Sequence, residues 1–498
     1  MSLATFSPKA ARASVPSWLA SMPLCFGLAV FTILVFGGAT PMLGDPDTQW
    51  HVATGRWILQ QGRVPRTDPF SFTFAGQEWI AKEWLSQVIL AAAHAAGGWP
   101  GVAALACVVT AATFALLFRL LAADVGGLLA AILSASAVIL TAPHLLARPH
   151  LLALPVMVLW TAGLVRAVER DWMPSPWLLV LMLLWANLHG GFTLGFMLAV
   201  GLGLEAVATA SDRADRVRKL IGWLGFGVAA VVVAGITPYG WRPFFVTHRI
   251  LELGSVLPLI DEWRSPDWQR QPAQLAVLLF AAVVALLGAV KVPLLRALVV
   301  AGLLYLYFRF ARNAELLGLL APILLAPIVA RRWSALIPVV AAGRAAPPSA
   351  AARAATMAAL CAAVLAAGWS QLRHSVLPPA VAPASAIAFA RGHALSGPVL
   401  NDYGFGGYLV NERVPTFIDG RAELYGRNFI LRYVAAISGH GGLAQLLDEY
   451  GIEWTLLRPD RPANELLALM PNWCQAYHDE NATLFVRSSA PGRGCTGP

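Results

Sequence analysis

The sequence predicts an α-helical polytopic membrane protein with about eleven transmembrane helices and a small C-terminal α/β soluble domain. Of the 498 residues, 58% are hydrophobic and only 13% are charged, and the mean hydropathy is +0.64. A soluble domain carries about 25% charged residues, so lipid must solvate most of this chain. The other two observations are a series of long apolar runs and a change of composition after about residue 371.

The apolar runs have spanning or near-spanning length. They cover approximately residues 18–43, 98–122, 125–143, 149–168, 175–188, 191–210, 217–237, 272–290, 293–311, 315–331 and 355–371. The first run follows Lys9 and Arg12, as in a signal peptide, but it has about spanning length and lacks an Ala-x-Ala cleavage pattern. We therefore predict that it is a membrane helix. The runs at 175–188 and 191–210 are either two helices or one helix broken at the turn 187–191.

Basic residues indicate how the chain is oriented. With the N-terminus in the cytoplasm, short basic clusters such as Arg213, Arg216, Arg218 and Lys219 fall in cytoplasmic connections, as the positive-inside rule requires. Residues 1–17 are then cytoplasmic, residues 18–371 form the transmembrane domain with a large first exoplasmic loop at 44–97, and residues 372–498 form an exoplasmic (periplasmic) domain. This topology predicts a multi-pass protein of the plasma (inner) membrane.

The net charge of +9, from 36 basic and 27 acidic residues, fits the same topology. Nucleic-acid binding would need basic residues interleaved with aromatic ones along a strand-sized groove, and no such run is present in the sequence. We therefore expect membrane lipids as partners and no nucleic acid.

The first exoplasmic loop, residues 44–97, is too polar for a simple connector. It opens with Asp45, Pro46 and Asp47, and Pro46 prevents a regular helix from continuing through this elbow. Residues 47–59 have helical spacing, with Trp50, Ala53 and Trp57 on one face. We predict that this helix lies in the membrane interface with its tryptophans among the headgroups.

Asp45 and Asp47 are the candidate catalytic residues. Two carboxylates on a rigid elbow can bind a divalent cation such as Mg²⁺ or Mn²⁺, or they can divide into a general base and an orienting partner. The alternative for Asp47 is that it caps the helix that follows. If one carboxylate is the base, the sequence favours Asp45, because it has no simpler role.

Several basic and polar residues are expected on the same outer side of the membrane. Ionisable residues at membrane depth are functional candidates, although each arginine can also extend its charged group to the lipid headgroups. The forked donors of arginine match a phosphate, so an acidic base beside such residues suits a lipid-phosphate substrate. The predicted substrate-binding residues are His51, Arg56, Glu83, Arg148, His150, His189, Arg242, Arg309 and Arg312.

The segment after the last helix contains short apolar stretches around a helical stretch near residues 443–450, which predicts the α/β domain. Gly404, Gly406 and Gly407 suggest turns between strands, because the Lys-Ser/Thr ending of a phosphate loop is absent. Asp419, Arg421 and Glu423 alternate, and they either face the membrane domain or form a surface ion pair. In an oxidising compartment Cys474 and Cys495 could form one disulfide. Residues 334–354 suggest a flexible cytoplasmic linker.

The DxD-like pair in the first exoplasmic loop, immediately after the first helix, resembles the GT-C superfamily of polytopic glycosyltransferases. That superfamily includes protein O-mannosyltransferases, oligosaccharyltransferases and aminoarabinose transferases. The resemblance is specific over about residues 18–97. It implies a polyprenyl-phosphate-linked sugar donor, a glycan, lipid or protein acceptor, and Asp45 or Asp47 at the acidic catalytic position. The motifs GDPDTQWHVATGRWI, WANLHGGF, TPYGW and NDYGFGGYL…FIDGRAELYG are similar to those of a broad group of bacterial membrane proteins.

Two other functions compete with glycosyl transfer. A transporter or lipid flippase would show paired inverted repeats with interrupted helices in both halves, whereas one strong interruption, at residues 187–191, is visible in the sequence. A non-catalytic protein of envelope-polysaccharide assembly would use the C-terminal domain to bind glycan or a partner. Intact function without both elbow carboxylates would favour the last of these.

Overall fold

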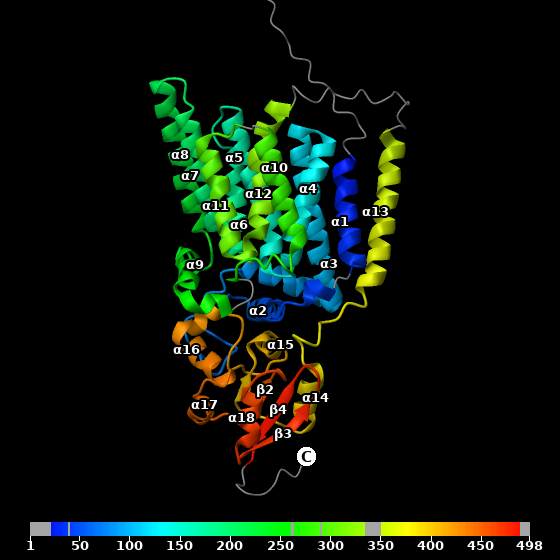
Figure 1. Ribbon diagram of the computed structural model, residues 1–498, viewed down its shortest axis with the longest axis vertical. Helices are drawn as coiled ribbons and strands as arrows, with labels where there is room; N and C mark the ends of the chain where they lie inside the picture. Colours follow the sequence, from blue (N-terminus) through cyan, green and yellow to red (C-terminus); the bar gives the residue numbers. More distant parts are fainter. Residues whose placement is uncertain (1–20, 38–39, 260–262, 289–290, 334–349, 489–498) are drawn as a thin grey trace, which may run out of the picture.

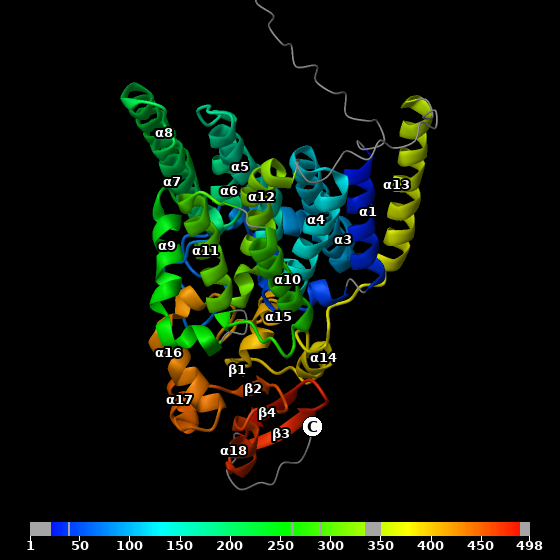
Figure 2. The ribbon, with the colours of Figure 1, turned by 45° about the horizontal axis from the view of Figure 1, so that its top comes forward.

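The computed structural model describes residues 21–37, 40–259, 263–288, 291–333 and 350–488. A bundle of helices forms one end of the molecule and a smaller mixed domain forms the other (Figures 1 and 2). The predicted cytoplasmic residues 1–17, most of the predicted linker at 334–354, and Cys495 lie outside the described residues.

Each of the predicted apolar runs overlaps one helix of the bundle. Within the described residues, seven helical spans are long and apolar enough to cross a membrane, and three shorter apolar helices accompany them. The eleventh helix of the bundle, α11, belongs to neither group. The bundle helices are α1 (Met22–Phe36), α3 (Trp84–Val125), α4 (Gly127–Thr141), α5 (Pro149–Glu169), α6 (Trp177–Leu188), α7 (Thr193–Ala208), α8 (Arg213–Ala234), α10 (Pro272–Gly288), α11 (Leu294–Arg309), α12 (Ala314–Trp333) and α13 (Ala350–Leu372). The prediction of a polytopic helical protein is confirmed.

The open question at residues 175–210 is answered by two separate helices. α6 ends at Leu188, and the short 3-10 helix η3 (Gly190–Phe192) leads directly into α7. Asn187 anchors the end of α6, because its side-chain amide donates to the backbone oxygens of Leu183 in the same helix and of Ile236 just after α8. The turn therefore fixes the position of His189 between the two helices.

The bundle has a continuous apolar core with an apolar exterior. Trp160, Trp185, Phe114 and Phe192 are fully buried in this core. Large apolar side chains are also exposed on the outside of the bundle; examples are Ile33, Leu128, Val200 and Leu286. A soluble protein rarely exposes so much apolar surface, and a lipid bilayer accounts for it.

At the bundle end away from the C-terminal domain, a buried ion cluster joins three helices. Arg296 of α11 is 1% exposed and donates to both oxygens of Glu205 of α7, at 2.6 and 3.0 Å. Its third nitrogen donates to Glu169 of α5 at 2.5 Å. Arg296 therefore belongs to the packed interior of the bundle.

The first loop, residues 44–97, is an ordered structure of its own. After the 3-10 helix η1 (Thr40–Leu43), α2 (Asp47–Gln61) lies across the end of the bundle, between it and the C-terminal domain (Figure 1). Residues 62–83 then lead to α3, whose first part, up to a kink at Gly97 and Gly98, falls within the predicted loop.

The expectation that the tryptophans of α2 lie among headgroups is wrong for Trp50. Trp50 and Ala53 are buried against Trp79, Tyr239 and Val410, which come from the loop, the connection between α8 and α9, and the C-terminal domain. This face of α2 is therefore an internal packing surface, because the C-terminal domain covers it.

The C-terminal domain carries one four-stranded sheet in the order β1-β2-β4-β3, with β1 parallel to β2 and the other pairs antiparallel. The strands are β1 (Val399–Asn401), β2 (Trp454–Leu457), β3 (Trp473–His478) and β4 (Thr483–Arg487). The helices are α14 (Ala384–Gly392), η7 (Tyr403–Phe405), α15 (Gly406–Asn411), α16 (Ala422–Ile437), α17 (Leu443–Glu449) and α18 (Ala463–Leu469). Three segments that connect the parts are α9 (Arg242–Glu252), η4 (Gly254–Leu259) and η6 (Ala311–Asn313).

Two details of the predicted domain differ from the structure. Two of the short apolar stretches, residues 408–410 and 416–418, are not strands of the sheet: residues 408–410 lie in the helix α15, and Thr416 forms an isolated bridge with Ser71 of the first loop. Gly406 and Gly407 begin α15 and do not form a turn between strands.

A buried ion cluster fastens the C-terminal domain to the first loop. Arg421 is fully buried and donates to both oxygens of Asp419, at 2.7 and 2.8 Å, and to Asp68 of the loop at 2.5 Å. The Tyr425 hydroxyl also donates to Asp419 at 2.8 Å. Burial alone raises the pKa of Asp419, but the Arg421 guanidinium outweighs this and lowers that pKa below its usual value. Asp419 and Arg421 therefore join the two domains and do not form a surface ion pair.

Candidate active site

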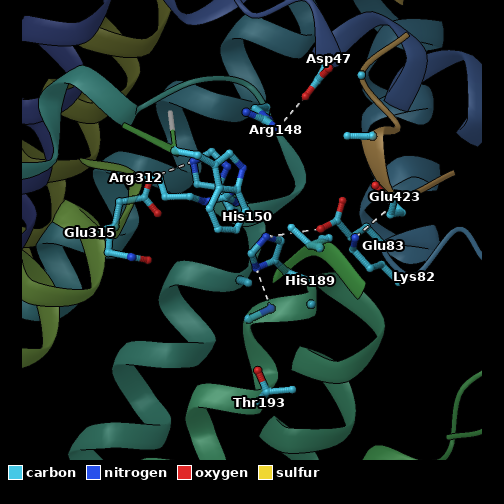
Figure 3. Close-up of a pocket in the computed structure, with 18 of the residues that line it drawn as sticks. Asp47, Lys82, Glu83, Arg148, His150, His189, Thr193, Arg312, Glu315 and Glu423 are labelled. Atoms are coloured by element: carbon cyan, nitrogen blue, oxygen red, sulfur yellow. Dashed lines mark hydrogen bonds and ion pairs between the residues drawn. The ribbon is translucent and has the colours of Figure 1, made fainter. Parts of the chain in front are cut away.

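A cavity of about 390 Å³ lies where the bundle, α2 and the C-terminal domain meet. On the bundle side its wall is apolar and is formed by α5, α7, α11 and α12, through side chains such as Leu154, Met157, Met197, Leu306 and Leu316. On the opposite side charged and polar groups from the loop and the C-terminal domain face inward (Figure 3). The cavity therefore has a lipid-like end and a polar end.

The two elbow carboxylates have different positions. Asp45 accepts the backbone N–H of Asp47 at 2.7 Å, so the capping role that the sequence offered to Asp47 belongs to Asp45. Asp47 lines the cavity and accepts from the Trp50 indole N–H at 3.0 Å. Arg148 bridges both, reaching Asp45 at 3.2 Å and Asp47 at 2.6 Å. Asp47 is thus the elbow carboxylate that faces the cavity.

At the start of α3, Glu83 lies between His51, which is buried, and His189, which is half-buried. Its carboxylate is 3.3 Å from Nε2 of His189 and 3.8 Å from Nε2 of His51. The far ring nitrogens are also engaged: Nδ1 of His51 lies 3.2 Å from the Gln87 amide nitrogen, and Nδ1 of His189 accepts the Gly191 N–H at 3.1 Å. This arrangement fixes both rings with their Nε2 atoms toward Glu83.

Burial sets the proton affinities of this group. Desolvation raises the pKa of Glu83 above its usual value. It also lowers the pKa of His51 well below the usual value, with the Arg148 charge as the next cause. The pKa of His189 is lowered well below its usual value by desolvation first and by His150 second. At neutral pH both imidazoles are therefore neutral.

A second histidine–carboxylate pair lies across the cavity. Nε2 of His150, at the start of α5, is 2.9 Å from Glu315 at the start of α12. Arg312, which precedes α12, lies over the Trp263 ring at 4.5 Å and lines the cavity beside Glu315 (Figure 3). The short breaks in the helices before α5 and α12 thus place His150, Arg312 and Glu315 together in the cavity wall.

Three charged cavity residues, Lys82, Glu315 and Glu423, are not among the substrate-binding residues predicted from the sequence. Lys82 lies 3.3 Å from Glu423 of the C-terminal domain, and Glu315 pairs with His150. Lys82 adjoins Glu83 and Glu315 follows Arg312 by three positions, so proximity to predicted residues was an available signal. Glu423 belongs to the FIDGRAELYG motif, but its contact with Lys82 depends on the docking of two domains.

The structure brings seven of the eleven predicted residues into the cavity wall; Asp45 lies behind it on Arg148, and three arginines lie elsewhere. Asp47, His51, Glu83, Arg148, His150, His189 and Arg312 line the cavity. Arg56 instead donates to Asn411 at 3.0 Å, Arg242 pairs with Glu78 at the surface, and Arg309 lies over Phe310 at 4.7 Å. These three arginines are not part of the cavity lining.

A Mg²⁺ or Mn²⁺ ion, one of the two roles that the sequence left open for the elbow carboxylates, does not fit between them. The Arg148 guanidinium bonds to both Asp45 and Asp47, so a positive charge of the protein already occupies the place between the carboxylates that a cation would need. Within the described residues, no group of three or more His, Cys, Asp or Glu side chains is arranged to hold a metal ion.

The lowered pKa of His189 predicts a pH-dependent stability. His189 has a folded-state pKa below that of the unfolded chain, so the unfolded state binds more protons between the two values, and stability is lost as the pH falls below about 6.5. We expect His189→Asn to reduce this acid-induced fall in melting temperature, because its side-chain oxygen can still accept the Gly191 N–H. Melting curves in detergent between pH 8 and about pH 5 measure the difference. Parallel curves for wild type and variant would show that His189 does not contribute.

Comparisons with known proteins support the architecture. No protein-family model matches the sequence, and no curated protein matches it either. Among solved structures, ArnT from Cupriavidus metallidurans bound to undecaprenyl phosphate superposes with a TM-score of 0.52 at 14% identity, over 97% of this chain and 100% of that chain. The same protein in the apo state gives 0.51 at 15% identity, over 94% and 97%.

The oligosaccharyltransferase AglB from Archaeoglobus fulgidus, in complex with an inhibitory peptide and a dolichol-phosphate, is a weaker match. Its TM-score is 0.47 at 9% identity, covering 89% of this chain and 69% of that chain. At such identities the likeness concerns the fold, and the ArnT superposition extends over nearly the whole of both chains. The chain is therefore a polytopic membrane protein with the GT-C-like fold.

Proposed function

We propose that this protein is a glycosyltransferase that transfers a sugar from a polyprenyl-phosphate donor to an acceptor at the outer face of the plasma membrane. The observation that carries the proposal is the two-ended cavity. Its apolar wall is built from membrane helices, and its polar end holds carboxylates, histidines and the positively charged side chains of lysine and arginine. A donor with a long apolar chain and a charged head has the same division.

The polyprenyl chain lies along the apolar wall, and the phosphate lies at the polar end. Arg312 and Lys82 line that end from opposite sides, and His150 lies beside Arg312 (Figure 3). Guanidinium and ammonium groups bind phosphate oxygens through charge-assisted hydrogen bonds. The undecaprenyl phosphate bound to ArnT, a protein of the same fold, supports this choice of donor.

In the transfer step, an acceptor hydroxyl attacks the anomeric carbon of the donor sugar. A new carbon–oxygen bond forms, the bond from the anomeric carbon to the phosphate oxygen breaks, and the hydroxyl proton passes to the Asp47 carboxylate. Arg148 orients that carboxylate, and Arg312 and Lys82 stabilise the charge on the departing polyprenyl phosphate. The acceptor is a glycan, a lipid or a protein that reaches the cavity from the side of the C-terminal domain.

Binding of undecaprenyl phosphate to the purified protein tests the donor site. We expect Arg312→Ala to weaken binding by about 10- to 100-fold, because a hydrogen bond to a charged group contributes about 1.5–3 kcal/mol. Arg309→Ala is the matched control: it removes the same side chain three positions earlier, outside the cavity lining, and should leave binding unchanged.

Two results would contradict the proposal. One is equal binding by both variants, which would place the phosphate elsewhere. The other would come from wild-type protein in liposomes, with a membrane extract that supplies acceptors. There the protein would move undecaprenyl-phosphate-linked sugars across the bilayer but release no undecaprenyl phosphate. The second result would favour a flippase.

A further inference from the structure

We infer that Gly420 of the C-terminal domain is a positioning residue for Asp47: because position 420 lacks a side chain, the Asp47 carboxylate can rest on the backbone there while it binds Arg148. The inference deepens the proposed function, since it makes the C-terminal domain a part of the active site. The geometric contact itself does not depend on that function.

The contact between the two residues leaves no room for a methyl group. A Cβ atom at position 420 would lie 1.7 Å from Oδ1 of Asp47, 2.7 Å from its Cγ and 2.8 Å from Nε1 of Trp50. Oδ1 is the oxygen that accepts the Trp50 indole N–H, while Oδ2 accepts from Arg148. Both oxygens are therefore held in the orientation that Gly420 permits.

Gly420 cannot move away from Asp47 without breaking the buried ion cluster. Its two neighbours are Asp419 and Arg421, both fully buried, and Arg421 is also bonded to Asp68 of the first loop. Exposing or separating such buried charges is costly. The carboxylate of Asp47, at the end of a short side chain, is the part that yields to an added methyl group.

Gly407 shows what a different kind of contact would do. A Cβ atom at position 407 would lie 2.0 Å from the backbone oxygen of Pro46, which is in the elbow and cannot rotate away. Substitution at Gly407 would therefore push the domains apart, whereas substitution at Gly420 would mainly turn the Asp47 side chain. The two glycines contact adjacent residues of the elbow, and Gly420 alone acts on the carboxylate.

A stability cycle tests the inference without any enzymatic assay. The four proteins are the wild type, Gly420→Ala, Asp47→Ala and the double variant, each purified at full length. Asp47→Ala removes both oxygens, so it makes room for the methyl group. We expect Gly420→Ala to lower the melting temperature by about 3 °C in the wild type and by less than half as much in the Asp47→Ala background, where only the Trp50 contact persists.

Gly392→Ala is the matched control for this cycle. Gly392 ends α14 in the same domain, and nothing lies within 4 Å of its added Cβ. Its substitution should leave the melting temperature unchanged in both the wild-type and the Asp47→Ala background. An equal loss of melting temperature from Gly420→Ala in both backgrounds would overturn the inference, because the methyl group would then act elsewhere. No loss in either background would overturn it as well.

The kinetic measurement separates this inference from the proposed function. With transfer established, Gly420→Ala should lower kcat at least about 10-fold with little change in KM for the donor, because the carboxylate moves and the phosphate site does not. A change confined to KM would contradict the positioning role. If the wild type transfers no sugar, the proposed function fails, and the stability cycle still decides whether Gly420 holds Asp47.

Discussion

Replacement of Asp47 by Asn is expected to abolish sugar transfer while the protein still inserts and folds. Asn is nearly isosteric and keeps an oxygen for the Trp50 indole, but it cannot accept the proton of an acceptor hydroxyl. Loss of a general base reduces a rate by about 10²- to 10⁴-fold. Release of undecaprenyl phosphate from a sugar-linked donor measures the rate, and the binding of undecaprenyl phosphate itself should change far less.

Asp45→Asn is the matched control for this experiment. An asparagine at position 45 can still accept the Asp47 backbone N–H, so the elbow keeps its shape. The variant removes one of the two carboxylate charges that pair with Arg148. We expect a smaller loss of activity than for Asp47→Asn. The reverse order, with Asp45→Asn inactive and Asp47→Asn active, would make Asp45 the base, as the sequence alone favours.

The membrane fold was predictable because lipid imposes a simple constraint on sequence. A span needs an apolar run of sufficient length, and the helices of the bundle coincide with such runs. The helix α2 was predictable from its periodicity. The burial of Trp50 was not, because Val410 and Tyr239, which cover it, are distant in sequence and no local pattern records that contact.

The residues of the candidate site also fall into those that the sequence could predict and those that depend on contacts between distant segments. Asp47 and His51 are four residues apart on one helix, so local spacing predicts that they are close, and Glu83 belongs to the same loop. For the arginines, topology indicates the side of the membrane but not the direction around a helix, and Arg242 and Arg309 therefore lie on the same side as the cavity without lining it. Glu423 and Gly420 reach the site only because a separate domain docks there.

That docking depends on Arg421, and its removal is the second change for which we expect a large effect. Arg421→Ala leaves Asp68 and Asp419 buried with no cation between them. Breaking a buried ion pair by removing one partner costs about 3–5 kcal/mol. The guanidinium also lies over the Trp79 ring at 4.7 Å, so the loop loses packing as well. We expect a large fall in melting temperature and faster proteolysis of the C-terminal domain.

Arg432→Ala, in the same domain, is the control that separates loss of domain docking from loss of one positive charge. Arg432 pairs with Glu449 at 2.6 Å, but the two side chains are 50% and 41% exposed, and an exposed pair contributes about 0–1 kcal/mol. Its loss should leave the melting temperature and the proteolysis rate nearly unchanged. If both variants behave alike, the buried cluster does not hold the domains together. If Arg421→Ala alone releases the C-terminal domain and sugar transfer ends with it, the loop, the bundle and the C-terminal domain act as one catalytic unit, because the Asp47 carboxylate then loses the backbone on which it rests.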